Sequence, residues 1–293
     1  MLIKVLSLKL PSISTWFIVP AVIAVLALML FLVNGSLSVS QESIGAFISS
    51  DFALYLLVGL AAQLVDGALG MAYGVTSTSF LLSLGVPPAI SSTSVHVAEM
   101  FTTGASAISH FRFKNINKKL FKSLLIPGVI GAIVGAYLLS DVIDGDVIKP
   151  YIAAYMLILG LIIIRKALQK TLVKNKTNRI GILAAAGGFL DSIGGGGWGP
   201  IVTSTLLGQG RDPRYTIGSV NAAEFVIAFA SGVTFLIFTG VSSWQVVSGL
   251  IIGGVIAAPL GAMLVGKIKR KPLMLIIGTL VIGLSVRTIW LSF

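Results

Sequence analysis

Apolar segments about as long as a bilayer is thick recur along this chain, and they limit its fold more than any other feature. A membrane-spanning helix needs roughly 20 predominantly apolar residues. Full-length candidates are Trp16–Val33, Pro88–His110, Lys119–Ser140, Lys149–Leu168, Pro213–Thr239, Trp244–Gly266 and Pro272–Trp290. Only 11% of the residues are charged, whereas a soluble domain has roughly a quarter. We therefore predict an all-α polytopic membrane protein whose partner is the lipid bilayer.

Shorter apolar segments occur as two pairs. They are Asp51–Val65 with Met71–Gly85, and Arg179–Leu190 with Trp198–Gly208. At 1.5 Å per residue each segment reaches only roughly 17–22 Å, which is short for a crossing. We predict half-helices that enter the membrane, break at glycine and return.

The N-terminal stretch allows two interpretations. Trp16–Val33 follows Lys4 and Lys9, as the apolar region of a signal peptide would. Its apolar run is long for a signal peptide, and no clear cleavage site follows it. We therefore favour a retained transmembrane helix.

Lysine and arginine gather on one side of the predicted membrane. If every full span changes sides and every half-helix pair returns, all of the 21 basic residues except Lys149 and Arg287 share the side of the N-terminus. This bias predicts a cytoplasmic N-terminus and an outside C-terminus in a bacterial-type cell (inner) membrane. The basic clusters are separated by apolar runs and form no continuous face with aromatic residues, so we predict no nucleic-acid partner.

The composition also narrows the chemistry. Cysteine is absent and there are two histidines, so disulfides and thiolate-bound metals are excluded and little is left for a metal site. The ATP-binding pattern G-x-x-x-x-G-K-[ST] does not occur. We expect no cofactor, no metal and no enzymatic activity.

An internal repeat divides the chain. Asp66–Glu99 aligns without gaps on Asp191–Glu224, 125 residues later. The matches include Asp66 with Asp191, Gly70 with Gly195, Gly74 with Gly199, Thr78 with Thr203, Ser79 with Ser204, Gly85 with Gly210, Pro88 with Pro213, Ser94 with Ser219 and Glu99 with Glu224. Each repeat contains a broken half-helix pair and three full spans, and because three is odd the second repeat is expected to be inverted. Inverted repeats with broken helices near the midplane are typical of secondary transporters.

The repeat sets the predicted domain organisation. Residues 1–45 form an extra N-terminal transmembrane helix and an outer loop, residues 46–170 the first transmembrane repeat, and residues 171–293 the second, inverted repeat.

Four acidic residues lie in apolar surroundings: Asp66, Asp191, Glu99 and Glu224. A charged side chain at membrane depth costs about 2.5–3.5 kcal/mol. These carboxyl groups must therefore be paired, hydrated or protonated, unless they lie at helix ends and reach water. His96 precedes Glu99 by one helical turn and is a candidate hydrogen-bond partner for it. We assign the four acids and His96 to proton coupling.

Glycine-rich breaks precede a short helix in each repeat. The run Gly194–Gly199 formally satisfies G-x-G-x-x-G, but without a βαβ unit it does not indicate a dinucleotide site. Glycine lets backbone N–H groups approach a ligand, and a helix N-terminus favours an anion. The alternative is close helix packing, which applies nearly as well to Gly187, Gly188, Gly253 and Gly254. The predicted substrate-binding residues are Gly70, Gly74, Thr76, Ser77, Thr78, Gly195, Gly196, Gly197, Trp198, Gly199, Thr203, Ser204 and Asn221, the last of which aligns with His96.

These motifs resemble the TauE/SafE family of sulfite-exporter-like transporters. The resemblance rests on D-G-A-L-G-M-A-Y-G-V-T-S-T-S at Asp66–Ser79, D-S-I-G-G-G-G-W-G-P at Asp191–Pro200 and G-S-V-N-A-A-E at Gly218–Glu224, and it covers most of the chain after about residue 50. It implies export or uptake of sulfite, of organosulfonates such as sulfoacetate, or of related small anions.

The leading hypothesis is a proton-coupled secondary transporter of a small anion, most simply sulfite or an organosulfonate, that works by alternating access. A cation- or sodium-coupled carrier or channel would use the same carboxylates. An intramembrane aspartyl protease is less well supported, because Asp191 follows G-F-L and Asp66 follows Q-L-V in place of the G-x-G-D signature. The sequence leaves a homodimer open.

Overall fold

All regular structure in the part of the chain that can be described is helical. The computed structural model describes residues 50–169, 179–240, 243–265 and 269–292. Within them, Ser50–Phe293 forms one compact unit, and no strand occurs among the described residues. This confirms the prediction of an all-α protein. The predicted helix at Trp16–Val33 lies outside the described residues.

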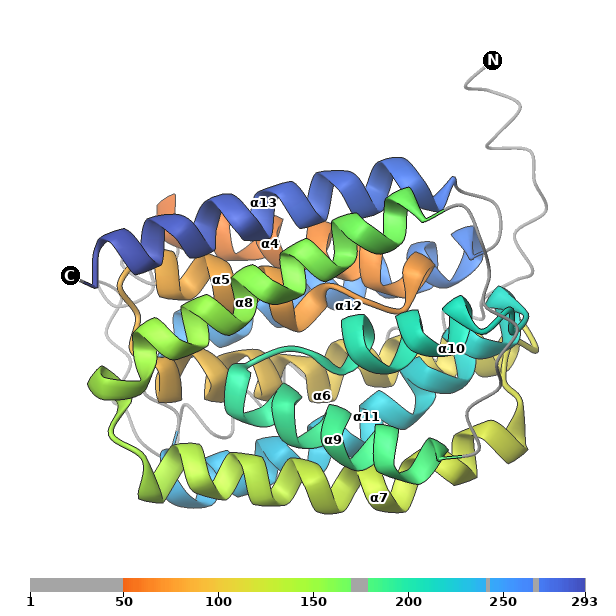
Figure 1. Ribbon diagram of the computed structural model, residues 1–293, viewed down its shortest axis with the longest axis horizontal. Coiled ribbons are helices and arrows are strands. Elements are labelled where there is room, and N and C mark those ends of the chain that lie inside the picture. Colours follow the sequence, from red (N-terminus) through yellow and green to blue (C-terminus); the bar gives the residue numbers. More distant parts are fainter. Residues whose placement is uncertain (1–49, 170–178, 241–242, 266–268, 293) are drawn as a thin grey trace, which may run out of the picture. The chain divides into compact units, whose positions relative to one another are not determined.

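The helices fall into two series that follow the repeat (Figure 1). The first series is α4 (Ser50–Leu69), α5 (Tyr73–Ser83), α6 (Pro88–Arg112), α7 (Lys118–Tyr137) with the π-helical turn η1 (Leu138–Val142), and α8 (Gly145–Leu168). The second is α9 (Ile180–Gly194), the π-helical turn η2 (Gly199–Thr203), α10 (Ser204–Gly208), α11 (Pro213–Phe238), α12 (Trp244–Leu264) and α13 (Arg270–Trp290).

Six described helices are long and apolar enough to cross a membrane. They are Phe52–Leu69, Lys118–Val142, Val147–Leu168, Pro213–Phe238, Trp244–Leu264 and Lys271–Trp290. This supports a multi-pass membrane protein. Helix α6 has the length of a span, with 25 residues, but it is rich in Ser and Thr and carries His96 and Glu99. Most of its polar residues, His96 and Glu99 among them, are buried against other helices, so its polar content does not exclude a membrane span.

The first helix of each short pair is longer than predicted. We predicted that the first would end at Val65, but α4 continues to Leu69 and its 20 residues suffice for a crossing. Beyond Val65 the helix packs closely on α12: a Cβ on Gly67 would lie 2.9 Å from Gly261 Cα. Helix α9 likewise continues past Leu190 to Gly194, but its 15 residues remain short.

The helices of one series pack mainly against helices of the other series. Helix α4 packs along α12 and its counterpart α9 packs along α7, while α6 packs on α11 and α8 on α13. Small residues allow the close approach: a Cβ on Gly188 or on Gly253 would collide with the carbonyl oxygen of Gly128 or of Leu56, respectively. Close packing therefore explains these two glycines. This packing is the pattern that a two-fold relation between halves produces, and the inversion relative to a membrane stays a prediction, as do the domain boundaries.

Candidate functional site

Each short helix pair breaks at a glycine that follows a buried aspartate by four residues. Gly70 and Gly195 have φ angles of 67° and 72°, a left-handed conformation that glycine adopts without steric cost. The Asp66 carbonyl accepts a 2.5 Å hydrogen bond from Gly70 N, and the Asp191 carbonyl likewise accepts from Gly195 N and also, at 2.9 Å, from Gly196 N. The two breaks are therefore built in the same way.

The two breaks lie directly against each other. A Cβ on Gly74 would lie 2.9 Å from Gly196 Cα. A Cβ on Gly199, the counterpart of Gly74, would lie 2.9 Å from the carbonyl oxygen of Gly70. Only glycine permits this approach, so these residues hold the two backbones in contact at one crossing.

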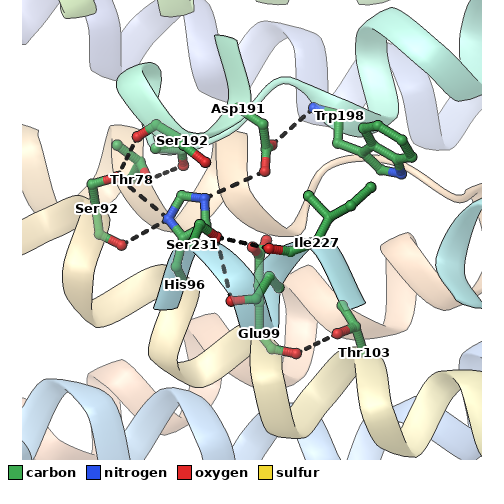
Figure 2. Close-up of polar contacts among 12 residues, drawn as sticks. Thr78, Ser92, His96, Glu99, Thr103, Asp191, Ser192, Trp198, Ile227 and Ser231 are labelled. Carbon is green, nitrogen blue, oxygen red and sulfur yellow. Dashed lines mark hydrogen bonds and ion pairs between the residues drawn. The ribbon is translucent and has the colours of Figure 1, made fainter. Parts of the chain in front are cut away.

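Asp191 links its own break to the first repeat (Figure 2). Its Oδ1 accepts a 2.8 Å hydrogen bond from the backbone N–H of Trp198, across the break. Its Oδ2 lies 3.3 Å from His96 Nε2 on α6. One carboxylate thus organises the loop and reaches a titratable side chain of the other half.

A hydrogen bond at the other ring nitrogen, Nδ1, holds His96 in place. Nδ1 lies 2.8 Å from the Ser92 carbonyl oxygen and must therefore donate to it. The Ser92 hydroxyl donates to the Ser192 carbonyl at 2.9 Å and so ties α6 to the end of α9. The ring packs on Phe235 with a centroid distance of 5.3 Å. The hydrogen bond toward a carboxylate therefore goes to Asp191, although Glu99 was the expected partner.

Asp66 makes the equivalent contact with Asn221. The Asn221 amide Nδ2 lies 3.4 Å from Asp66 Oδ2 and 3.2 Å from the Ser106 hydroxyl. Both Asp66 and Asn221 are fully buried. Asn221 therefore occupies the position in the second half that His96 occupies in the first.

The two glutamates complete a buried group of four carboxyl groups. Glu99 and Glu224 are 1% and 4% exposed. Glu99 Oε1 reaches the crossing, since it would lie 3.0 Å from a Cβ on Gly74. Glu224 interacts electrostatically with Asp66, Glu99 and Asp191. The structure thus brings together all five side chains that we assigned to proton coupling.

Hydroxyl groups surround the crossing. Thr78 donates to the carbonyl oxygen of Gly195, the break glycine of the other half. The hydroxyls of Thr76, Ser77 and Thr203 are buried and have no hydrogen-bond partner among the described residues. Buried hydroxyls without a protein partner call for a polar ligand or for water.

Two predicted binding residues contribute in a different way. The Trp198 indole is fully buried in an apolar cluster with Leu124 and Ile227, and its Nε1 donates to the Val220 carbonyl at 3.3 Å. Only its backbone N–H points to the site. The Ser204 hydroxyl donates to the Pro200 carbonyl within its own helix pair.

Comparison with known proteins gives the family. A model of the sulfite exporter TauE/SafE family matches residues 55–288. The chain belongs to this family. It is also 44% identical over 246 residues to the probable membrane transporter protein YtnM of Bacillus subtilis (strain 168), an alignment that covers 80% of this chain and 82% of that protein. No solved structure matches. This TauE/SafE protein is therefore a membrane transporter, and the resemblance read from its motifs is confirmed.

Two site residues of this TauE/SafE protein were missed by sequence reasoning. The Tyr155 hydroxyl is buried against Gly197, since a Cβ on that glycine would collide with it, and it has no hydrogen-bond partner among the described residues. Lys166 donates to the Ser204 hydroxyl. Both lie on α8, outside the aligned part of the repeat. Their sequence signals were weak: one tyrosine in an apolar span and one lysine in a basic cluster.

Three donor atoms of the site are close enough for a cation to be considered. One ligand atom each from His96, Glu99 and Asp191 lies within 4.8 Å of the others. Because Nδ1 of His96 already donates a hydrogen bond, the imidazole ring could bind a cation only through the lone pair of Nε2. That lone pair faces Asp191 Oδ2 at hydrogen-bond distance. The contacts therefore indicate a hydrogen-bonded pair of His96 and Asp191 beside the carboxyl group of Glu99.

A basic cavity of about 520 Å³ opens at the far end of the second helix pair. Its lining includes Lys119 in the first turn of α7, and Arg211 and Asp212 just before α11. Asn117 caps α7 by accepting from Lys119 N at 3.0 Å, and Asp212 caps α11 by accepting from Tyr215 N at 3.2 Å. Predicted topology places this cavity on the cytoplasmic side.

Proposed function

We propose that this protein is a secondary transporter that moves a small anion, sulfite or an organosulfonate, with protons and by alternating access. The observation that supports this best is the crossing of the two glycine breaks, which is surrounded by buried hydroxyls without partners and by four carboxyl groups. Two chain breaks in contact with each other are the feature around which the halves of such a carrier rearrange.

The donors at the crossing suit a small oxyanion. Thr76 and Ser77 are the fourth and fifth residues of α5, and their buried hydroxyls have no hydrogen-bond partner among the described residues. The N-terminal end of a helix also favours negative charge. The oxygens of sulfite and of a sulfonate group accept hydrogen bonds, so hydroxyls and backbone N–H groups can bind them without a buried lysine or arginine.

The carboxyl groups supply the coupling in this proposal. An anion that arrives beside Asp66, Glu99, Asp191 and Glu224 adds negative charge to a buried volume that already contains four acids. Proton uptake offsets that charge. Anion and proton therefore bind together and are released together, and anion movement follows the proton gradient.

Flux into proteoliposomes tests the proposal. Purified protein is reconstituted, and uptake of ³⁵S-labelled sulfite and sulfoacetate is measured with an imposed pH gradient in sodium-free choline buffer and again with sodium. Uptake that is driven by the proton gradient without sodium supports the proposal. Uptake that requires sodium favours the sodium-coupled carrier, and absence of flux for both anions refutes the substrate class. A homodimer stays a prediction that cross-linking in the membrane would test.

A further inference from the structure

Building on the proposed function, we propose that the His96–Asp191 pair carries the transported proton, and that the Asn221–Asp66 pair is its counterpart, in which an amide that cannot take up a proton replaces the imidazole. The two halves of the protein would then have the same geometry at the crossing but unequal roles. One half would exchange the proton, and the other would hold the crossing in place.

The two pairs are equivalent by sequence and by contact. His96 aligns with Asn221 and Asp66 with Asp191, both at an offset of 125 residues. In each pair a residue of one half reaches the aspartate of the other half, at 3.3 Å for His96 Nε2 and 3.4 Å for Asn221 Nδ2. His96 and Asn221 therefore make matching contacts but differ in chemistry.

A proton must lie between His96 and Asp191. Nδ1 donates to the Ser92 carbonyl at 2.8 Å, so a neutral ring has a bare Nε2. A bare Nε2 and an ionised Oδ2 would be two acceptors 3.3 Å apart. The contact is satisfied when the ring is protonated or when the carboxyl group is, and in both cases the pair holds one exchangeable proton.

The Asn221 amide donates a hydrogen bond to one oxygen of Asp66 without any proton exchange. Nδ2 donates to Asp66 Oδ2 and to the Ser106 hydroxyl, and it keeps both hydrogens at every pH. Both residues are fully buried. This pair can anchor α11 against α4, but it cannot carry a proton on its amide.

The surroundings of His96 contain other titratable groups, all of them acidic. Helix α6 packs against α5, α8, α9, α11 and α12, and α12 contains no titratable side chain. The groups that face the site are Glu99 on α6, Asp66 on α4, Tyr73 at the start of α5, Tyr155 on α8, Asp191 on α9 and Glu224 on α11. Among these and His96, only the imidazole becomes positive when it binds a proton. It is therefore the group whose protonation favours an anion most directly.

Exchanging the two residues tests the inference. The parent is compared with His96→Asn, Asn221→His and the double variant that carries both changes. His96→Gln is a second variant that removes the imidazole. His110→Asn is the matched control, because His110 is buried on the same helix but has Asn115 as its hydrogen-bond partner. Two readouts are taken in proteoliposomes: sulfite exchange without a gradient, and protons moved per sulfite, measured with an internal pH dye.

We expect the parent and His110→Asn to move about one proton per anion through this pair. His96→Asn and His96→Gln should keep measurable exchange but lose accumulation driven by the pH gradient, and the double variant should regain it. If the parent accumulates sulfite without any response to pH, the proposed coupling itself fails. If the parent is coupled and both His96 variants remain equally coupled, the assignment of the pair is overturned. A double variant that exchanges sulfite but regains no coupling overturns the equivalence of the two pairs.

Discussion

Substitution of Gly74 by alanine tests whether the two breaks are packed as the structure has them. Gly74 is the second residue of α5, where alanine would gain at most about 1 kcal/mol of helix propensity. The added Cβ, however, would lie 2.9 Å from Gly196 Cα and 3.2 Å from the Gly195 carbonyl oxygen. These are backbone atoms of the other half, and they can yield only if the two breaks move apart.

The expected magnitude follows from these opposing effects. Overpacking a close contact costs about 1–3 kcal/mol, so Gly74→Ala should be destabilised by up to about 2 kcal/mol after the gain in helix propensity. A loss of about 1.4 kcal/mol in the bound state corresponds to about a tenfold loss of anion affinity. Gly283→Ala is the control, because Gly283 lies in α13 with nothing within 4 Å of its Cβ position.

Unfolding and transport are measured on the same preparations. The four tryptophans allow thermal unfolding to be followed by fluorescence in detergent, and sulfite flux is measured after reconstitution. We expect Gly74→Ala to unfold several degrees below the parent and to need about tenfold more sulfite for half-maximal flux, while Gly283→Ala is unchanged or more stable. If the two variants unfold together and transport equally well, the breaks are not in contact and the crossing cannot be the site.

Three further predictions concern topology, pH dependence and salt. Cysteine at Asp144 should react with an impermeant reagent from outside, whereas cysteine at Lys118 should react only after permeabilisation; equal labelling in intact cells contradicts the inverted-repeat topology. Sulfite flux should rise as pH falls on the side from which the anion is taken, because protons neutralise the carboxylates. Glu99→Gln and Glu224→Gln should bind sulfite but lose part of this dependence in a flux assay over a pH series. Arg211→Gln in the basic cavity should raise the KM for sulfite several-fold at low ionic strength and less at high salt, which screens exposed charges; equal effects at both salt concentrations would exclude an electrostatic role.

Much of the fold could be predicted because the bilayer imposes simple rules. Apolar length located most of the described spans, and the gap-free repeat located both breaks to within a few residues. The ends of the first helices were missed because a buried aspartate and a glycine resemble a helix stop in sequence. In α4 the glycine is required by the approach of Gly261, which belongs to a helix almost 200 residues later and cannot be identified from the local sequence.

The contents of the site could be predicted better than its contacts. The four acids stood out because each is costly in an apolar segment, and repetition made the pattern stronger. The partner of His96 could not be inferred, since helical periodicity pointed to Glu99 one turn away and the actual partner, Asp191, belongs to the other half. Tyr155 and Lys166 have no counterpart in the aligned motifs, so their approach to the second break depends wholly on how α8 packs.

A mismatch within a repeat becomes informative only when its partner is known. In sequence, His96 against Asn221 is one difference among many. In the structure both side chains reach the equivalent aspartate of the opposite half at nearly the same distance, so the difference leaves the geometry intact and changes only the capacity to exchange a proton. Had a duplication kept both positions identical, both halves would offer the same proton site. If the His96–Asp191 pair carries the proton as we propose, a single substitution on matched contacts gives two similar halves different roles in one transport cycle.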